Sequence, residues 1–163
     1  MSKLIVHASA ISIYMAHRWY GILISGPSGV GKSDLTLQAL KAGFRLIADD
    51  YSLLWLSGPQ GSKKLYARAP ETISERMEIR GLGIINQSAR PMSGIDLVVH
   101  CQTEAIERMP EPLITPILGQ ALPTLKINPR EASAVAKVLM ALRLLPLGGN
   151  EAQLGLSQSR ICG

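Results

Sequence analysis

The sequence contains few aromatic residues and few cysteines. Phe, Trp and Tyr make up 4% of its 163 residues, so the core must be built mainly from Leu, Ile, Val, Ala and Met. Its two cysteines, Cys101 and Cys162, are far apart and lack the spacing of metal ligands, which favours a reducing compartment. No run approaches 18 apolar residues, so we expect no membrane span, no secretory signal and a cytoplasmic protein.

Clustered positive charge is also missing. The net charge is +5, but the basic residues are scattered. No run of Lys and Arg lies beside aromatic residues that could stack on bases, which argues against a nucleic-acid partner. A hydrophobic content of 47% with 18% charged residues is typical of a globular protein. We therefore expect one domain over residues 1–145, followed by a loosely ordered tail over 146–163 that is rich in Gly, Ser and Gln.

The most informative stretch is Gly26-Pro27-Ser28-Gly29-Val30-Gly31-Lys32-Ser33, which fits the P-loop pattern G-x-x-x-x-G-K-[ST]. An apolar run at 21–25 predicts a strand before it, and a helical pattern follows it. Backbone N–H groups of such a turn point at phosphate oxygens, helped by the positive end of the helix dipole. We expect Lys32 to reach the outer phosphates and Ser33 to ligate Mg²⁺. A chance glycine-rich turn is the weaker alternative.

The remaining pattern predicts an α/β fold, a P-loop-containing kinase domain with a small mixed sheet and flanking helices. A helix is expected from Lys32 to Ala42, with Leu35 and Leu37 among its inward residues and Gly43 at its end. A hairpin tip is expected at 17–20. Strands are expected at 4–10, 11–14, 21–25, 44–48, 52–56, 63–69 and 95–100, edge strands at 113–117 and 122–127, helical turns at 72–77 and 103–108, and a second long helix at 130–145.

Two adjacent carboxylates, Asp49 and Asp50, follow the strand predicted at 44–48. Ligands of open α/β sheets gather outside the carboxyl ends of the strands. Two strands that flank one helix would place the aspartates at the same edge as the P-loop. Carboxylates there hold Mg²⁺ or accept a proton from a substrate hydroxyl. The alternative, a simple turn before Tyr51, is weaker so close to a P-loop.

The run from Glu78 to Asn86 reads Glu-Ile-Arg-Gly-Leu-Gly-Ile-Ile-Asn and combines an acid, a base and two glycines beside an apolar pair. Glycines permit positive φ angles and close backbone approach. A loop that carries Glu78 and Arg80 offers a metal ligand and a clamp for a phosphate. A surface salt bridge beside a turn fits the same spacing, and spacing alone does not decide between them. His100 is more typical of a half-buried residue than of a site.

Together, the P-loop, Asp49-Asp50 and the run 78–85 resemble the catalytic domain of HPr kinase/phosphorylase, over about residues 4–145. The resemblance implies an enzyme that uses ATP and Mg²⁺ to phosphorylate a serine of the phosphocarrier protein HPr, in regulation of the phosphotransferase system. It also implies a reverse phosphorolysis that forms pyrophosphate, and a hexamer. The N-terminal regulatory domain of longer members has no counterpart in the sequence, so we expect the short form seen in alphaproteobacteria.

The resemblance implies a role for each matching residue. Lys32 corresponds to the phosphate-binding lysine, and Ser33 and Glu78 correspond to the magnesium ligands. Asp50 corresponds to the proton acceptor for the substrate serine. Asp49 beside it is expected to help hold the metal.

Four further residues complete the implied site. His7 and Arg108 correspond to an active-site histidine and an active-site arginine. Arg130 is the charged anchor of a segment, 123–130, that the family associates with dephosphorylation. Arg80 or Arg108 would add positive charge beside the transferred phosphoryl group. For His7, a packing role is the alternative.

Three other classes of protein share parts of the pattern. A P-loop kinase for a small metabolite would carry lid helices with clustered arginines, which the sequence lacks. A GTPase-like switch would carry N-K-x-D and D-x-x-G motifs, and neither occurs. A nucleotide-binding scaffold without turnover stays open, although the presence of Lys32, Ser33, Asp50 and Glu78 argues against it.

Overall fold

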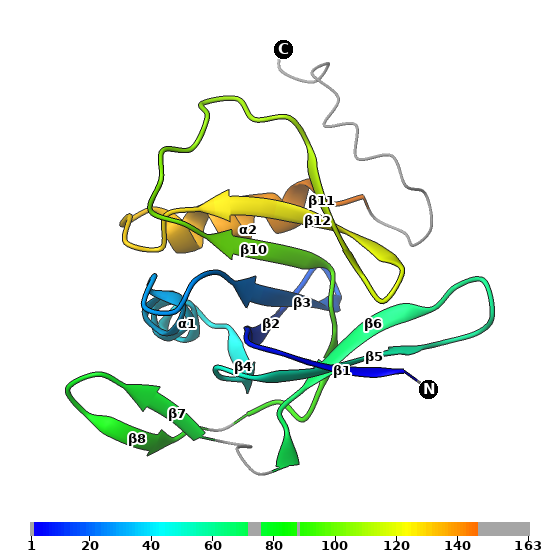
Figure 1. Cartoon of the computed structure of the whole chain (residues 1–163), viewed down its shortest axis with the longest axis horizontal. Coiled ribbons are helices and arrows are strands. Elements are labelled where there is room, and N and C mark those ends of the chain that lie inside the picture. The colour runs from blue at the N-terminus through cyan, green and yellow to red at the C-terminus, as the bar shows by residue number, and fades with distance from the viewer. Residues whose placement is uncertain (1, 72–75, 88, 147–163) are drawn as a thin grey trace.

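The structure is a computed structural model that describes residues 2–71, 76–87 and 89–146 (Figure 1). It contains two helices and strands that form three sheets. The elements are β1 (Lys3–Val6), β2 (Ser9–Met15), β3 (Arg18–Ser25), α1 (Lys32–Lys41), β4 (Arg45–Ala48), β5 (Ser52–Ser57), β6 (Lys64–Arg68), β7 (Arg76–Ile79), β8 (Gly83–Asn86), β9 (Ser93–Gly94), β10 (Leu97–Cys101), β11 (Leu113–Ile117), β12 (Gln120–Ile127) and α2 (Ala134–Leu144).

The central sheet has six strands in the order β11-β12-β10-β3-β2-β4. β10 is parallel to both β3 and β12, whereas β2 is antiparallel to both β3 and β4. β4 therefore runs in the same direction as β3. As a result, the carboxyl ends of β12, β10, β3 and β4 lie at one edge of the sheet, which is also where β2 begins. This confirms the prediction that the glycine-rich loop and the aspartate pair share an edge.

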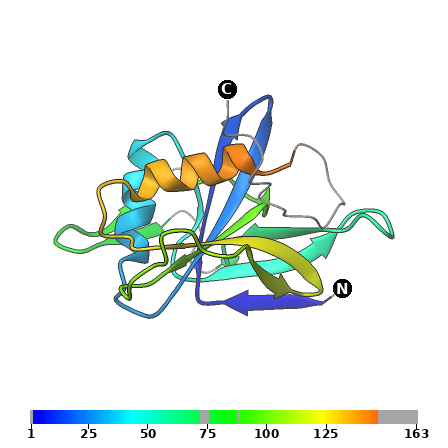
Figure 2. The ribbon, with the colours of Figure 1, turned by 90° about the horizontal axis from the view of Figure 1, so that it is seen from above.

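Both faces of the central sheet are buried. Ile22 and Ile24 of β3 belong to a core cluster that also contains residues of α1 and α2, and both helices lie on that side of the sheet (Figure 2). Leu23, between them, packs with Leu54 and Leu65 of a four-stranded sheet with the order β1-β5-β6-β9. Successive strand residues point to opposite faces, so one apolar run serves both layers. The predicted mixed α/β architecture is confirmed.

The helix after the glycine-rich loop ends as predicted. Gly43 has a φ of 101°, a left-handed conformation that glycine adopts without a Cβ penalty. Its N–H donates to the carbonyl of Leu40, and the N–H of Phe44 donates to that of Ala39, the two bonds of a Schellman motif. Leu37, predicted to face inward with Leu35, is instead exposed. The two lie about 200° apart around the helix and cannot share a face.

Two strand expectations need correction around the prolines and the first hairpin. The segment predicted as an edge strand at 122–127 lies inside the sheet, in β12, between β10 and β11. Pro123 is tolerated because pairing with β10 begins only at Thr124. The first hairpin tip is Ala16-His17 rather than 17–20. Both residues have positive φ, as a two-residue type I′ turn requires.

The predicted helical segments also differ from the structure. No helix forms at 103–108 because six residues followed by prolines cannot sustain one. The turn predicted at 72–77 falls largely outside the described residues, and its last two residues begin β7. α2 begins at Ala134 rather than at 130, because the side-chain oxygen of Asn128 accepts the N–H of Arg130 and holds a turn there.

The run 78–86, predicted as a loop, is largely the hairpin β7–β8, a separate two-stranded sheet that stands beside the central one (Figure 1). Its root is anchored by Met77, which is 1% exposed within the core cluster of the helices. Of the tail predicted at 146–163, all but Pro146 lies outside the described residues. In the described part, no helix is long and apolar enough to cross a membrane.

Candidate active site

The glycine-rich loop (residues 26–33) joins the end of β3 to the start of α1. Gly26, Gly29 and Gly31 have φ angles of 141°, 76° and 116°, all in the region that side chains disfavour. At Gly26 a Cβ would also lie 2.5 Å from the backbone oxygen of Cys101, at the end of β10. The loop can therefore lie this close to the neighbouring strand only with glycine at that position.

Lys32 is held inside this loop. Its Nζ donates to the backbone oxygens of Gly26 and Pro27, each at 3.0 Å, and the residue is 5% exposed. Because the loop already fixes this lysine, binding of a ligand at its charge would cost little further side-chain entropy. The geometry therefore supplies a fixed positive charge at the start of the helix.

The start of α1 provides hydrogen-bond donors beside that charge. Its N-cap residue is Gly31, and no side chain caps the first turn. The first backbone N–H groups of a helix lack partners within the helix, and together with the positive end of the dipole they attract anions. The loop thus offers the environment in which phosphate groups are commonly bound.

A cavity of about 310 Å³ opens at this sheet edge. It collects side chains from the glycine-rich loop, the end of β4, the hairpin β7–β8 and the connections next to β1 and α2. Its lining includes most of the predicted site residues: His7, Ser28, Gly29, Gly31, Lys32, Ser33, Asp50, Glu78, Arg80 and Arg130. Asp34, Leu37 and Ile79 complete it.

Asp50 reaches the cavity from a strained backbone. It has a φ of 60°, which is uncommon for a residue other than glycine and is best tolerated by Asn and Asp. Its N–H donates to the hydroxyl of Ser9 on β2, over 3.3 Å. Strain of this kind persists only where the surroundings hold it, and it is often found at functional sites.

Asp49 lies behind the cavity lining rather than on it. The residue is 7% exposed, and its two carboxylate oxygens accept the Ser9 hydroxyl at 3.1 Å and the Glu78 N–H at 3.4 Å. Burial, and then the negative charge of Asp50, raise the pKa of Asp49, while these hydrogen bonds lower it. Its predicted role at the metal remains a prediction, and its observed contacts are to the scaffold.

His7 lines the cavity beside an aromatic ring that the sequence did not single out. The ring of Tyr51 lies against the imidazole, with 5.2 Å between the centroids, and Tyr51 is 48% exposed. His7 therefore packs against Tyr51 and also borders the cavity, so its role in the site stays a prediction. Ser9 was missed as well, since a serine two residues after a histidine belongs to no motif.

The hairpin β7–β8 brings Glu78 and Arg80 to the cavity lining. Among the described residues, neither of them takes part in an ion pair. The surface salt bridge that the spacing also allowed is therefore not formed, and both side chains border the cavity. The hairpin turn exposes Leu82 and Ile84, which are 76% and 71% exposed.

Five predicted site residues do not line the cavity: Gly26, Pro27, Val30, Asp49 and Arg108. Arg108 is the one that lies in a separate segment. It is exposed, in the irregular segment between β10 and β11, and does not line the cavity. A resemblance between sequences shows which positions are equivalent, but it does not show whether the side chain at such a position extends into the cavity. His100, half-buried as expected, lies 3.3 Å from the Ser25 hydroxyl by its Nδ1, also outside the lining.

The oxygen groups at the cavity suit a hard cation only in combination with a ligand. In the described part of the chain, no three His, Cys, Asp or Glu side chains gather closely enough to hold a metal by themselves. Mg²⁺ usually keeps several waters and is bound by one or two carboxylates plus substrate phosphates. Ser33, Asp50 and Glu78, which border one cavity, are compatible with that arrangement.

Comparison with known proteins places this chain in a family. The profile of the HPr Serine kinase C-terminal domain matches residues 1–142. The chain belongs to this family. HPr kinase/phosphorylase of Geobacillus kaustophilus is 35% identical over 164 residues, which cover 91% of this chain and 50% of that protein. The enzyme of the same name from Treponema pallidum is 34% identical over 146 residues, which cover 82% and 44%.

This member of the HPr kinase family spans about half the length of the curated relatives that it matches. A solved structure described as the Hpr(Ser) kinase/phosphatase from Coxiella burnetii superimposes with a TM-score of 0.68 and 23% identity. That likeness covers 86% of this chain and 91% of the other. The resemblance expected from the three motifs is therefore confirmed at the level of family and fold.

Proposed function

We propose that this chain is an ATP-dependent protein kinase that phosphorylates a serine of an HPr-like phosphocarrier protein, in regulation of the phosphotransferase system. The observation that carries the proposal is the common cavity of Lys32 and Asp50. A phosphate-binding lysine and a carboxylate that can accept a proton border one space, from two strands that end at the same edge. Family membership and the relatives named HPr kinase/phosphorylase support this reading.

The nucleotide phosphates would bind at the glycine-rich loop. The fixed Nζ of Lys32 and the uncapped N–H groups of the first turn of α1 provide positive charge and donors for them. Arg80 and Arg130 border the same cavity and would neutralise charge on the transferred phosphoryl group. Phosphoryl transfer depends mainly on positioning and charge neutralisation, so this set of groups matches its demands.

The acceptor serine would approach Asp50. A hydroxyl is a weak nucleophile, and a carboxylate within about 2.6–3.2 Å would take its proton as the bond to phosphorus forms. Asp50 is the carboxylate that the backbone of β4 delivers into the cavity, whereas Asp49 is occupied by scaffold hydrogen bonds. His7 would orient the carboxylate or contact a phosphate oxygen.

Magnesium would be held by the hydroxyl of Ser33 and the carboxylate of Glu78, together with nucleotide phosphates. A bound Mg²⁺ ion supplies charge neutralisation between the outer phosphates. Ser33 lies at the start of α1 and Glu78 on β7, so the two proposed ligands come from separate elements that line the same cavity.

The same groups would serve a reverse reaction. Inorganic phosphate would attack the phosphorus of phosphoserine, giving pyrophosphate and free serine, and Asp50 would return the proton to the serine oxygen. Arg108, as an active-site arginine, and Arg130, at the segment associated with dephosphorylation, are further parts of this proposal. A hexamer and a cytoplasmic location also follow from the family resemblance, and light scattering after size exclusion would test the first.

Incubation with labelled ATP, Mg²⁺ and purified HPr tests the function. We expect acid-stable phosphoserine on HPr, reduced at least about 100-fold in Asp50→Asn. The exposed Glu104→Gln is the matched control and should react like the wild type. Lys32→Ala should weaken ATP binding as well as transfer, because its charge contacts the nucleotide before the reaction.

Other outcomes would favour the rival classes. Transfer to a small hydroxyl compound but not to HPr would indicate a metabolite kinase. ATP binding without transfer to either acceptor would indicate a scaffold. Undiminished transfer in Asp50→Asn would remove this residue as the base.

A further inference from the structure

The Ser9 hydroxyl, which the sequence did not single out, contacts both aspartates at once. It donates to a carboxylate oxygen of Asp49 at 3.1 Å and accepts the N–H of Asp50 at 3.3 Å. Ser9 is the first residue of β2 and has no exposed surface. One hydroxyl therefore fixes a side chain and a backbone amide of two consecutive residues.

We propose that Ser9 is a positioning residue for the aspartate pair. Its hydroxyl fixes the strained backbone of Asp50 directly, and it fixes the Asp49 carboxylate, which in turn binds the N–H of Glu78 on β7. Asp50 has a φ of 60°, and its N–H has the Ser9 oxygen as its acceptor. A left-handed aspartate without that bond would gain freedom to turn its carboxylate away from the cavity.

The second oxygen of Asp49 extends the network to the hairpin. It accepts the N–H of Glu78 at 3.4 Å, across from β4 to β7. The hairpin forms a sheet of its own and is not part of the central ladder. In addition to the apolar packing of Met77, Ile79 and Ile85, this bond connects the hairpin to the aspartate pair, so Ser9 acts on Glu78 through Asp49.

A second buried serine on the same strand shows what a hydroxyl without this role looks like. Ser12 also has no exposed surface, but its Oγ has no hydrogen-bond partner in the structure. Loss of the Ser12 hydroxyl removes no hydrogen bond to the described residues, whereas loss of the Ser9 hydroxyl removes one bond to Asp49 and one from the Asp50 amide. Ser12→Ala is therefore a closely matched control.

The first test follows the backbone amide protons of Asp50 and Glu78 by NMR in the full chain at a fixed pH. Ser9→Ala should make the Asp50 amide exchange with solvent about tenfold faster and should shift the Glu78 amide resonance, whereas Ser12→Ala should leave both unchanged. Equal exchange of the Asp50 amide in wild type and Ser9→Ala would overturn the proposal, as would a Glu78 resonance that does not move.

The second test is kinetic and rests on the proposed function. With ATP and HPr, Ser9→Ala should lower kcat by about tenfold, with little change in the KM for ATP. Ser9→Thr, which keeps the hydroxyl, should restore kcat. Equal effects of Ser9→Ala and Ser12→Ala would contradict the role. If the wild type transfers no phosphate, the function fails while the NMR result still decides on Ser9.

Discussion

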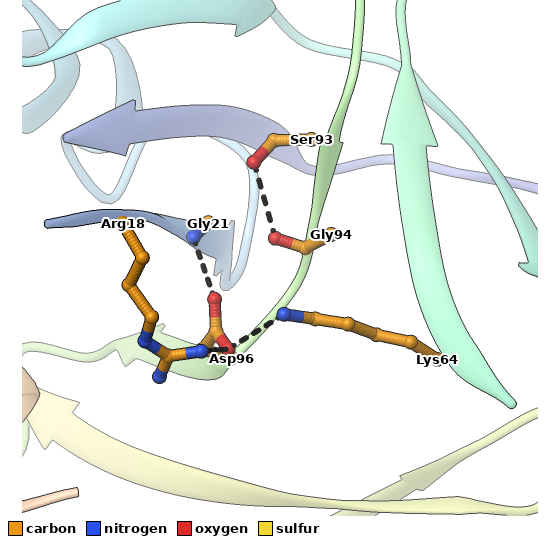
Figure 3. Close-up of polar contacts among 6 residues, drawn as sticks. All are labelled: Arg18, Gly21, Lys64, Ser93, Gly94 and Asp96. Atoms are coloured by element: carbon orange, nitrogen blue, oxygen red, sulfur yellow. Dashed lines mark hydrogen bonds and ion pairs between the residues drawn. The ribbon is translucent and has the colours of Figure 1, made fainter. Parts of the chain in front are cut away.

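Asp96 and Gly21 hold each other through two hydrogen bonds. The N–H of Gly21 donates to the Asp96 carboxylate at 2.9 Å (Figure 3). The N–H of Asp96 donates to the Gly21 oxygen at 2.8 Å. The carboxylate also accepts Lys64 at 2.9 Å and lies 3.4 Å from Arg18. Because Lys64 is on β6 and Gly21 on β3, one side chain links the two large sheets.

Removal of the Asp96 carboxylate should destabilise the fold. Asp96→Ala leaves the Gly21 amide and two cations without their acceptor in a site whose carboxylate is only 10% exposed. We expect a loss of about 2 kcal/mol in the free energy of unfolding, measured by urea titration. Glu71→Ala breaks a pair in which the glutamate is 85% exposed and should cost less than about 0.5 kcal/mol. Equal losses would show that the Asp96 network adds no more to the free energy of unfolding than an exposed ion pair does.

Substitution of Gly26 should damage the loop beyond the ordinary cost of a left-handed alanine. Gly26→Ala adds a Cβ 2.5 Å from the backbone oxygen of Cys101, in addition to the φ penalty. Gly119→Ala, at a φ of 82° with open space around it, isolates that penalty of about 1 kcal/mol. We expect Gly26→Ala to be less stable than Gly119→Ala and to lose nucleotide affinity, measured by calorimetry. Similar melting temperatures for the two variants would refute the steric argument.

Two arginines implied by the same resemblance should differ in nucleotide binding. Arg130 borders the cavity and Arg108 does not. We expect Arg130→Ala to raise the Kd for ATP about tenfold, whereas Arg108→Ala leaves it near the wild-type value, because charge acts on the phosphates mainly at short range. Fluorescence titration with a nucleotide analogue measures both constants. A larger effect of Arg108→Ala would show that this arginine reaches the nucleotide.

Folding stability should depend on pH through Asp49. Its raised pKa means that the folded chain holds a proton which the unfolded chain releases at lower pH. The stabilisation is therefore complete below the ordinary aspartate pKa and is lost as the pH rises through the raised value. The free energy of unfolding of the wild type, minus that of Asp49→Asn, should fall across this window. A difference that stays constant with pH would contradict it, and the exposed Glu104→Gln provides the baseline.

The sequence predicted those parts of the site that depend on local pattern. The glycine-rich loop and the helix that follows it are encoded by neighbouring residues, and Asp50 follows a strand whose direction the P-loop context implies. The structure confirms their common edge. Local pattern offered Glu78 as a metal ligand or as half of a surface salt bridge, and the resemblance favoured the first. The resemblance also added His7 and Arg130, which come from distant segments that local pattern cannot connect.

What the sequence missed depends on contacts between distant residues. Ser9 and Tyr51 gain their positions through a bond over 40 residues and a ring contact over 44 residues of chain, and neither leaves a periodic signal. Pro123 suggested an edge strand because its pairing partner could not be known. The short helix expected at 103–108 failed for a different reason, since weak local propensity needs tertiary packing to become structure.

Three of the charged or polar residues that line the cavity lie within three residues of the end of a strand. Asp50 lies two residues beyond β4 and Arg130 three beyond β12, while His7 sits in the two-residue link between β1 and β2. Such short attachments leave few backbone torsions to be frozen when a ligand arrives, so binding there costs little conformational entropy. The hairpin β7–β8 pairs with neither larger sheet, but Met77, Ile79 and Ile85 pack against the core and the Glu78 N–H donates to Asp49. The strand side of the cavity is therefore pre-organised by short links, and the hairpin side by the contacts of its own residues with the core.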